Sequence, residues 1–150
     1  MSVDAGIYIT LAEHSSKIML PHNIIAWLLN YGWTLDDGGK TSYLPVNDNE
    51  SFAWQNEDIS FKSLMNIVLE KESNQEVVGI AITWQNTGIG GTLLLYNNGK
   101  ITFSVNINRQ IIEVPDGTKV TDVTWYLIRF LPALNRSDCW VEHFTYDESR

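Results

Sequence analysis

The chain has 150 residues, of which 44% are hydrophobic and 19% charged, and its formal net charge is −8. These values argue against wholesale disorder and predict one domain spanning residues 1–150 that buries roughly 70% of its unfolded surface. The negative charge disfavours direct binding to nucleic acid or anionic lipid and favours basic partners, although it can also serve solubility alone.

The cysteine count and the apolar runs bear on location. Cys139 is the single cysteine, so no internal disulfide can form, which indicates a reducing compartment. The longest apolar runs, 24–29 and 77–82, are too short to span a bilayer. Residues 1–4 lack a basic stretch followed by an apolar run. We therefore expect no secretory signal, no membrane association and a cytoplasmic location.

The first elements are a strand and a helix. Residues 6–11 are rich in β-branched and aromatic side chains, which predicts a strand. Pro21 suits the first turn of a helix, and the apolar residues between 24 and 29 supply its buried stripe. Gly32 is expected to end this helix.

An irregular segment, residues 34–58, separates the first helix from the second. Its short apolar piece at 43–46 is the only hint of a strand within it. Asp58 or Ser60 is expected to cap the second helix, which should end near residues 72–74. The predicted apolar face of that helix consists of Phe61, Leu64, Met65, Val68 and Leu69.

Three consecutive antiparallel strands are predicted at residues 76–84, 92–97 and 101–108. Asn98-Gly99 is a two-residue hairpin signal, because a type I′ turn requires positive φ at both positions. This turn places Leu95 opposite Thr102 and Leu93 opposite Ser104. The resulting outer sheet face is a nearly charge-free strip of Val77, Gly79, Ala81, Leu93, Leu95, Thr102, Ser104 and Asn106. We expect another part of the chain, a partner or a second copy in a homodimer to cover it.

The last third predicts an extended piece at 110–114, a turn at 115–117 and a third helix from Thr121 or Asp122. Pro132 should kink that helix or end it early. Residues 139–146 predict the last strand and 147–150 a frayed tail. The order of elements is typical of an α+β fold, with a largely antiparallel sheet and three helices packed mainly on one face.

No catalytic or metal-binding pattern emerges, and we expect a protein that is not an enzyme. On one strand, Cys139 and His143 would lie ~13 Å apart, too far for a dyad. Cys139 is therefore expected to be a small buried hydrophobe. The sequence Gly88-Ile89-Gly90-Gly91 predicts a flexible hairpin loop, because strands flank it on both sides. His14, His22 and His143 lack zinc-ligand spacing, and residues 47–50 lack the pattern of a calcium loop, so no metal or cofactor is expected.

The densest acidic set lies in the irregular segment, where it surrounds a tryptophan. Aromatic side chains ringed by carboxylates can anchor a basic protein partner, although they can also simply pin a loop to the body. We predict that the partner-binding residues are Asp36, Asp37, Asp48, Glu50, Trp54, Glu57 and Asp58.

An acidic, aromatic-rich chain without catalytic motifs resembles small bacterial immunity proteins, including those that neutralise contact-dependent growth-inhibition toxins. Residues 77–109 (VVGIAITWQNTGIGGTLLLYNNGKITFSVNINR) also look like bacterial proteins of this kind. The resemblance implies a stoichiometric inhibitor that blocks the active site of a cognate toxin, often a basic nuclease. It assigns no residues, because that group shares no binding motif. Two alternatives are an enzyme or small-ligand binder with a site assembled from distant residues, and a dimeric adaptor that uses the outer sheet face.

Overall fold

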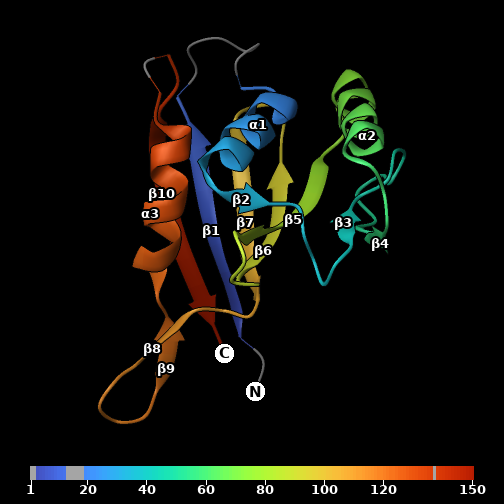
Figure 1. Ribbon diagram of the computed structural model, residues 1–150. Helices are drawn as coiled ribbons and strands as arrows, with labels where there is room; N and C mark the ends of the chain where they lie inside the picture. The colour runs from blue at the N-terminus through green and yellow to red at the C-terminus, as the bar shows by residue number, and fades with distance from the viewer. Residues whose placement is uncertain (1–2, 13–18, 137) are drawn as a thin grey trace.

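The computed structural model describes residues 3–12, 19–136 and 138–150 (Figure 1). Within this part of the chain, three helices and ten strands form an α+β fold in which every strand pairing is antiparallel. The predicted fold class is confirmed. The main sheet has the order β10-β1-β7-β6-β5-β3-β4, and β2 pairs with β5.

The strands of the main sheet are β1 (Asp4–Leu11), β2 (Trp33–Thr34), β3 (Thr41–Tyr43), β4 (Gln55–Glu57), β5 (Val78–Trp84), β6 (Gly90–Leu95), β7 (Lys100–Ile107) and β10 (Val141–Ser149). A separate hairpin consists of β8 (Ile111–Glu113) and β9 (Lys119–Thr121). The helices are α1 (Pro21–Tyr31), α2 (Phe61–Ser73) and α3 (Val123–Leu134). No helix in the described part of the chain has the length and apolar character needed to cross a membrane.

Local sequence signals set the helix ends. Pro21 begins α1, and Gly32, with φ of 137°, follows its last residue. The Ser60 hydroxyl accepts the N–H of Ser63 at the start of α2. Asp122 similarly caps α3, which contains Pro132 and ends two residues later. The predicted caps of α2 and α3 and the predicted ends of α1 and α2 are therefore confirmed, whereas α3 continues through Pro132 to Leu134.

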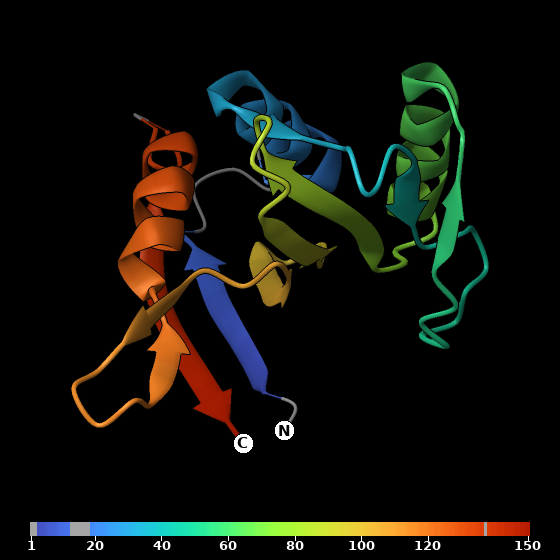
Figure 2. The same cartoon turned by 60° about the horizontal axis from the view of Figure 1, so that its bottom comes forward.

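Helices α1 and α3 lie on the same face of the main sheet, and α2 lies beyond β5, next to the β3–β4 hairpin (Figures 1 and 2). The core lies between the sheet and the helices α1 and α3, and it also includes Leu64 and Val68 of α2. Trp33 is its largest buried side chain; the ring stacks on Phe130 with centroids 4.6 Å apart, and Nε1 donates to the carbonyl of Arg129 at 2.9 Å. Cys139 is fully buried in the same core, as predicted.

The hairpin between β6 and β7 has a different register from the predicted one. Tyr96 donates its N–H to the carbonyl of Lys100 at 3.0 Å, so three residues, 97–99, form the loop. Gly99 takes the left-handed conformation, with φ of 81°, that such a loop requires at its last position. Leu95 is therefore opposite Ile101, and Leu93 is opposite Phe103.

This shift by one residue moves whole side-chain sets from one sheet face to the other. Leu93 and Leu95 are fully buried in the core, so the prediction that they lie on the outer face is wrong. Ala81 is opposite Thr92 and lies on the outer face as predicted, where it is buried. The residues that β1, β6 and β7 direct to the outer face are Tyr8, Thr92, Leu94, Thr102, Ser104 and Asn106.

Two other predictions fail because strand pairing extends further than the sequence indicated. Gly90 and Gly91 belong to β6 and are buried rather than in a loop. A Cβ atom at Gly91 would lie 1.8 Å from the carbonyl oxygen of Ser104, so this close approach of backbones requires glycine. Strand β10 continues to Ser149, which is opposite Asp4, and residues 147–149 are not frayed.

The apolar face of α2 is narrower than predicted. Phe61 and Leu69 are 57% and 45% exposed, whereas Leu64, Val68 and the aliphatic part of Lys71 are buried. The physical reason is position, because α2 lies at the end of the sheet and contacts it over a short length (Figure 2).

Candidate functional site

The seven predicted binding residues lie in the chain within or next to the β3–β4 hairpin, which is at the end of the sheet (Figure 1). In this hairpin Thr41 is opposite Glu57, and Tyr43 is opposite Gln55. One end of the hairpin therefore has Asp36, Asp37, Glu57 and Asp58 close in sequence to it. The other end carries the loop 45–53, which includes Asp48 and Glu50. Trp54 directly follows this loop. The structure thus divides the predicted set into two groups.

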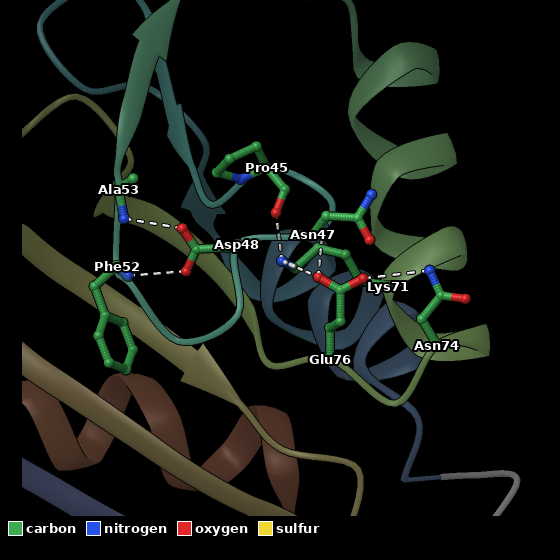
Figure 3. A network of polar contacts seen from close by, with 8 residues as sticks. All are labelled: Pro45, Asn47, Asp48, Phe52, Ala53, Lys71, Asn74 and Glu76. Atoms are coloured by element: carbon green, nitrogen blue, oxygen red, sulfur yellow. Dashed lines mark hydrogen bonds and ion pairs between the residues drawn. The ribbon is translucent and has the colours of Figure 1, made fainter.

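Asp48 is an internal support of the loop 45–53. Its side chain is buried, with the residue only 7% exposed. One carboxylate oxygen accepts the N–H of Phe52 at 2.9 Å, and the other accepts the N–H of Ala53 at 3.0 Å (Figure 3). Because both oxygens are used by the loop itself, Asp48 shapes the surface and does not present its charge to a partner.

A buried lysine ties the same loop to α2. The Lys71 ammonium donates to the carbonyl of Pro45 at 2.7 Å and to Glu76 Oε1 at 3.3 Å (Figure 3). Glu76 also accepts the N–H of Asn47 at 2.8 Å and the side-chain amide of Asn74 at 3.3 Å. Burial opposes ionisation of Glu76, but these hydrogen bonds and the Lys71 charge lower its pKa overall. The network holds the loop against the turn that joins α2 to β5.

Between the loop and this turn lies a hollow of about 400 Å³. Its lining residues are Asp48, Asn49, Glu50, Phe52, Lys71, Asn74, Gln75, Glu76 and Val77. Among the described non-glycine residues, seven have positive φ, and five of them are here: Asn47, Asn49, Glu50, Phe52 and Gln75. This conformation costs energy, especially for bulky side chains such as Phe52, and such strain concentrates at functional surfaces.

At the other end of the hairpin, most carboxylates hold the local turns. Asp36 accepts the N–H of Gly39 at 2.9 Å, and Asp37 accepts the hydroxyl of Ser42 at 2.6 Å. Glu57 accepts the hydroxyl of Tyr43. This hydrogen bond, with burial and the Glu57 charge, raises the pKa of Tyr43 to about 12.

A second hollow, of about 360 Å³, lies beside these turns. Asp36 and Asp58 both line it, together with Lys40, Ile59 and Phe61. Asp58 is exposed at its rim, and the structure gives its side chain neither a hydrogen bond nor an ion pair with any described residue. The same holds for Glu50 at the first hollow. These two are the carboxylates of the predicted set that make no such contact with a described residue, and we call them the free carboxylates.

The contacts of Trp54 fit the alternative role, in which the ring pins a loop to the body of the protein. A Cβ atom at Gly79 would lie 2.9 Å from Trp54 Cη2 and 2.5 Å from Leu44 Cδ1. The indole ring and Leu44 therefore cover the backbone of β5 directly, and Trp54 is partly buried. It pins the hairpin to the sheet.

Exposed aromatic side chains are nevertheless present next to the free carboxylates. Phe52 is 44% exposed and shares the first hollow with Glu50, and Phe61 is 57% exposed and shares the second with Asp58. Neither ring belongs to the set of binding residues predicted from the sequence. Phe52 lies two residues from Glu50 in an irregular acidic segment, which is the one signal that could have indicated it.

The side chains considered for chemistry lie elsewhere. Burial raises the pKa of the Cys139 thiol. His22 contacts Glu72, with Nδ1 2.8 Å from Oε1, and His14 is outside the described residues. Across the described ranges, no three His, Cys, Asp or Glu side chains are grouped as a metal site requires.

Comparison of the chain with protein-family models, with curated proteins and with solved structures gives no match. The function of this surface is therefore inferred from its geometry and charge.

Proposed function

We propose that this protein is an immunity-type inhibitor that acts in the bacterial cytoplasm, where it binds a basic protein toxin and blocks its active site. One observation carries the proposal. Two exposed phenylalanines, Phe52 and Phe61, each share a hollow with an exposed carboxylate that no cation of the described residues neutralises. We name the two patches together, Glu50 with Phe52 at one end of the β3–β4 hairpin and Asp58 with Phe61 at the other, the acidic aromatic surface.

Such a surface fits a basic protein for two reasons. Aromatic side chains that become buried at an interface contribute much of its binding energy. Carboxylates attract a basic enzyme over a distance and can occupy positions that substrate phosphates would take in its active site. With a net charge of −8, the whole chain adds to this attraction.

The geometry favours protein recognition over a small-molecule site at the first hollow. Small-ligand sites combine an apolar lining with polar groups that converge on the ligand. Here Asp48, Lys71 and Glu76 direct their hydrogen bonds to the loop and to the turn. These three side chains hold the backbone in its strained conformation. The exposed residues Glu50 and Phe52 then remain to contact a protein partner.

The test is whether the chain protects cells from a toxic protein domain, taken from a neighbouring gene that encodes one. Co-expression of the chain with the toxic domain of the adjacent gene product should restore growth, and the two proteins should co-purify in equal amounts. A Glu50→Lys/Asp58→Lys double variant should protect poorly. The control, Asp4→Lys/Glu113→Lys, changes two exposed acids in β1 and β8 and has the same net charge. Failure of the wild-type chain to protect or to bind would reject the proposal.

A further inference from the structure

Strand β10 (Val141–Ser149) forms one edge of the main sheet (Figure 2). On one side it pairs with β1 along nearly its whole length, and no described strand pairs with its other side. An edge of nine residues is long, and its unpaired N–H and C=O groups can accept another strand.

The pairing with β1 determines which backbone groups of β10 remain free. Leu11 donates its N–H to Gly99, toward β7, and Ala12 donates its N–H to Trp140, next to β10. Because these directions alternate along a strand, Thr10, Tyr8 and Gly6 direct their backbone groups to β10. Their partners His143, Thr145 and Asp147 point back to β1. The backbone groups of Phe144 and Tyr146 therefore point outward, to the open edge.

We propose that a second copy of this chain pairs with β10 through its own β10, antiparallel, with the two-fold axis at Thr145. The sequence around Thr145 is complementary to itself in this register. Phe144 is then opposite Tyr146 of the second copy on the core face, and His143 is opposite Asp147 on the outer face. Aromatic pairs and pairs of a histidine with a carboxylate are both favourable across strands, and each occurs twice.

Other registers lack this complementarity. A shift of one residue places outward backbone groups opposite inward ones, so no ladder forms. A two-fold axis at Tyr146 places Phe144 opposite Glu148, and an axis at Phe144 places Glu142 opposite Tyr146. Each alternative keeps one aromatic pair, Tyr146 with Tyr146 or Phe144 with Phe144, in place of two, and both lose the pairs of His143 with Asp147. The outward N–H and C=O groups of β10 and the side-chain pairs therefore both favour the register with the axis at Thr145.

The surroundings of the edge also fit a covered surface. Phe144 is 43% exposed, and Ile128 on α3 is 55% exposed. Between α3 and β10 is a hollow of about 360 Å³ to which Leu131, Val141 and Phe144 contribute apolar atoms. Continuation of the sheet into a second copy would bury the Phe144 ring, which contributes favourable free energy in proportion to the apolar area covered.

The register also contains pairs of like charge, because Glu142 is opposite Glu148 of the second copy, and this pair too occurs twice. Glu148 is compensated within its own chain: Arg150 lies 2.5 Å from Oε2, and Arg109 lies 3.7 Å from Oε1. Its side chain is 9% exposed, whereas Glu142 is exposed. The repulsion is therefore reduced.

Light scattering and a cysteine scan test the proposal. The wild-type chain should approach twice its mass of 17.1 kDa as concentration rises. A Thr145→Cys variant should form a disulfide-linked dimer under mild oxidation. The two Thr145 residues form a non-hydrogen-bonded pair, in which the Cα atoms of opposite residues are about 4.5 Å apart. The control is His143→Cys, whose two copies would be separated by ~13 Å along the strands and should not cross-link. The native Cys139 is buried and serves as the background in both variants.

A charge exchange tests the register independently. His143→Asp places two acids opposite each other and should weaken the dimer, whereas the double variant His143→Asp/Asp147→His should restore it. Circular dichroism of each variant shows whether the fold is retained. A wild-type chain that stays monomeric overturns the proposal, as does equal cross-linking of Thr145→Cys and His143→Cys. A folded Thr145→Cys variant that forms no disulfide dimer also overturns it.

Discussion

The ammonium nitrogen of Lys71 lies 2.7 Å from the carbonyl oxygen of Pro45, so a cation buried in α2 holds the loop that follows β3. Lys71→Met keeps much of the apolar stem but removes the ammonium that donates to that carbonyl and pairs with Glu76. We expect a loss of about 3 kcal/mol in the free energy of unfolding, because removal of one partner of a buried ion pair leaves the charge of the other partner buried without compensation. Urea unfolding measures it. The control, Lys62→Met, changes an exposed lysine of the same helix and should have little effect.

Adjacent leucines of β6 test the observed register. Leu93 is fully buried in the core, whereas Leu94 is on the outer face and partly exposed. Leu93→Ala should lower the free energy of unfolding by about 2–5 kcal/mol, since it removes buried methyl groups and leaves a cavity. Leu94→Ala should cost about 1 kcal/mol or less. The predicted two-residue turn requires the opposite ranking, so thermal unfolding of the two variants distinguishes the registers.

A glycine in β6 is required by the close approach of its neighbour strands. Gly91→Ala would place a Cβ atom 1.8 Å from the carbonyl oxygen of Ser104, and this backbone atom cannot move without distorting β7. We expect a loss of about 1–3 kcal/mol in the free energy of unfolding. In Gly6→Ala, the added Cβ contacts only the Tyr8 side chain, at 3.3 Å, and Tyr8 is exposed and can move. Comparable losses in the two variants would contradict this explanation.

Glu148 should make the fold sensitive to acid. Burial opposes its ionisation, but hydrogen bonds from Tyr146 and Thr121 and the charge of Arg150 lower its pKa from 4.5 to about 2. A carboxyl with a lower pKa in the folded state stabilises the fold above its unfolded pKa, and that contribution is lost as the pH falls from 4.5 toward 2. Glu148→Gln should be less stable at neutral pH and should show a flatter pH dependence in this window. Glu113→Gln, at an exposed site, should follow the wild-type curve in thermal unfolding.

Binding kinetics separate charge from contact at the acidic aromatic surface. With the co-purified toxin immobilised, Glu50→Lys/Asp58→Lys should slow association, and the difference from wild type should shrink as salt rises, because exposed charges are screened. Phe52→Ala should mainly speed dissociation, since an aromatic anchor acts through contact. Thermal unfolding of each variant serves as the folding control. An association rate that is indifferent to both salt and charge reversal would place the interface elsewhere.

Local chemistry made much of the fold predictable. Pro21, Gly32, Ser60 and Asp122 bound the helices where the sequence placed them, because caps and stops depend on groups within a few residues of the helix end. The strands of the central sheet were also indicated by their composition. The concentration of carboxylates in residues 36–58 marked the region where the candidate surface lies.

Tertiary structure decided the rest. Whether the loop before Lys100 has two residues or three depends on how β6 packs on the core, and a change of one residue determines whether Leu93 is buried or exposed. Asp48 and Glu50 are both acidic residues of the same loop, and the sequence does not distinguish their roles. In the folded loop Asp48 points inward and accepts two backbone N–H groups, whereas Glu50 is exposed. Trp54 covers Gly79, a residue of another strand, and so leaves Phe52 as the exposed ring. Such choices depend on contacts between residues far apart in the chain, and local propensity carries no information about them.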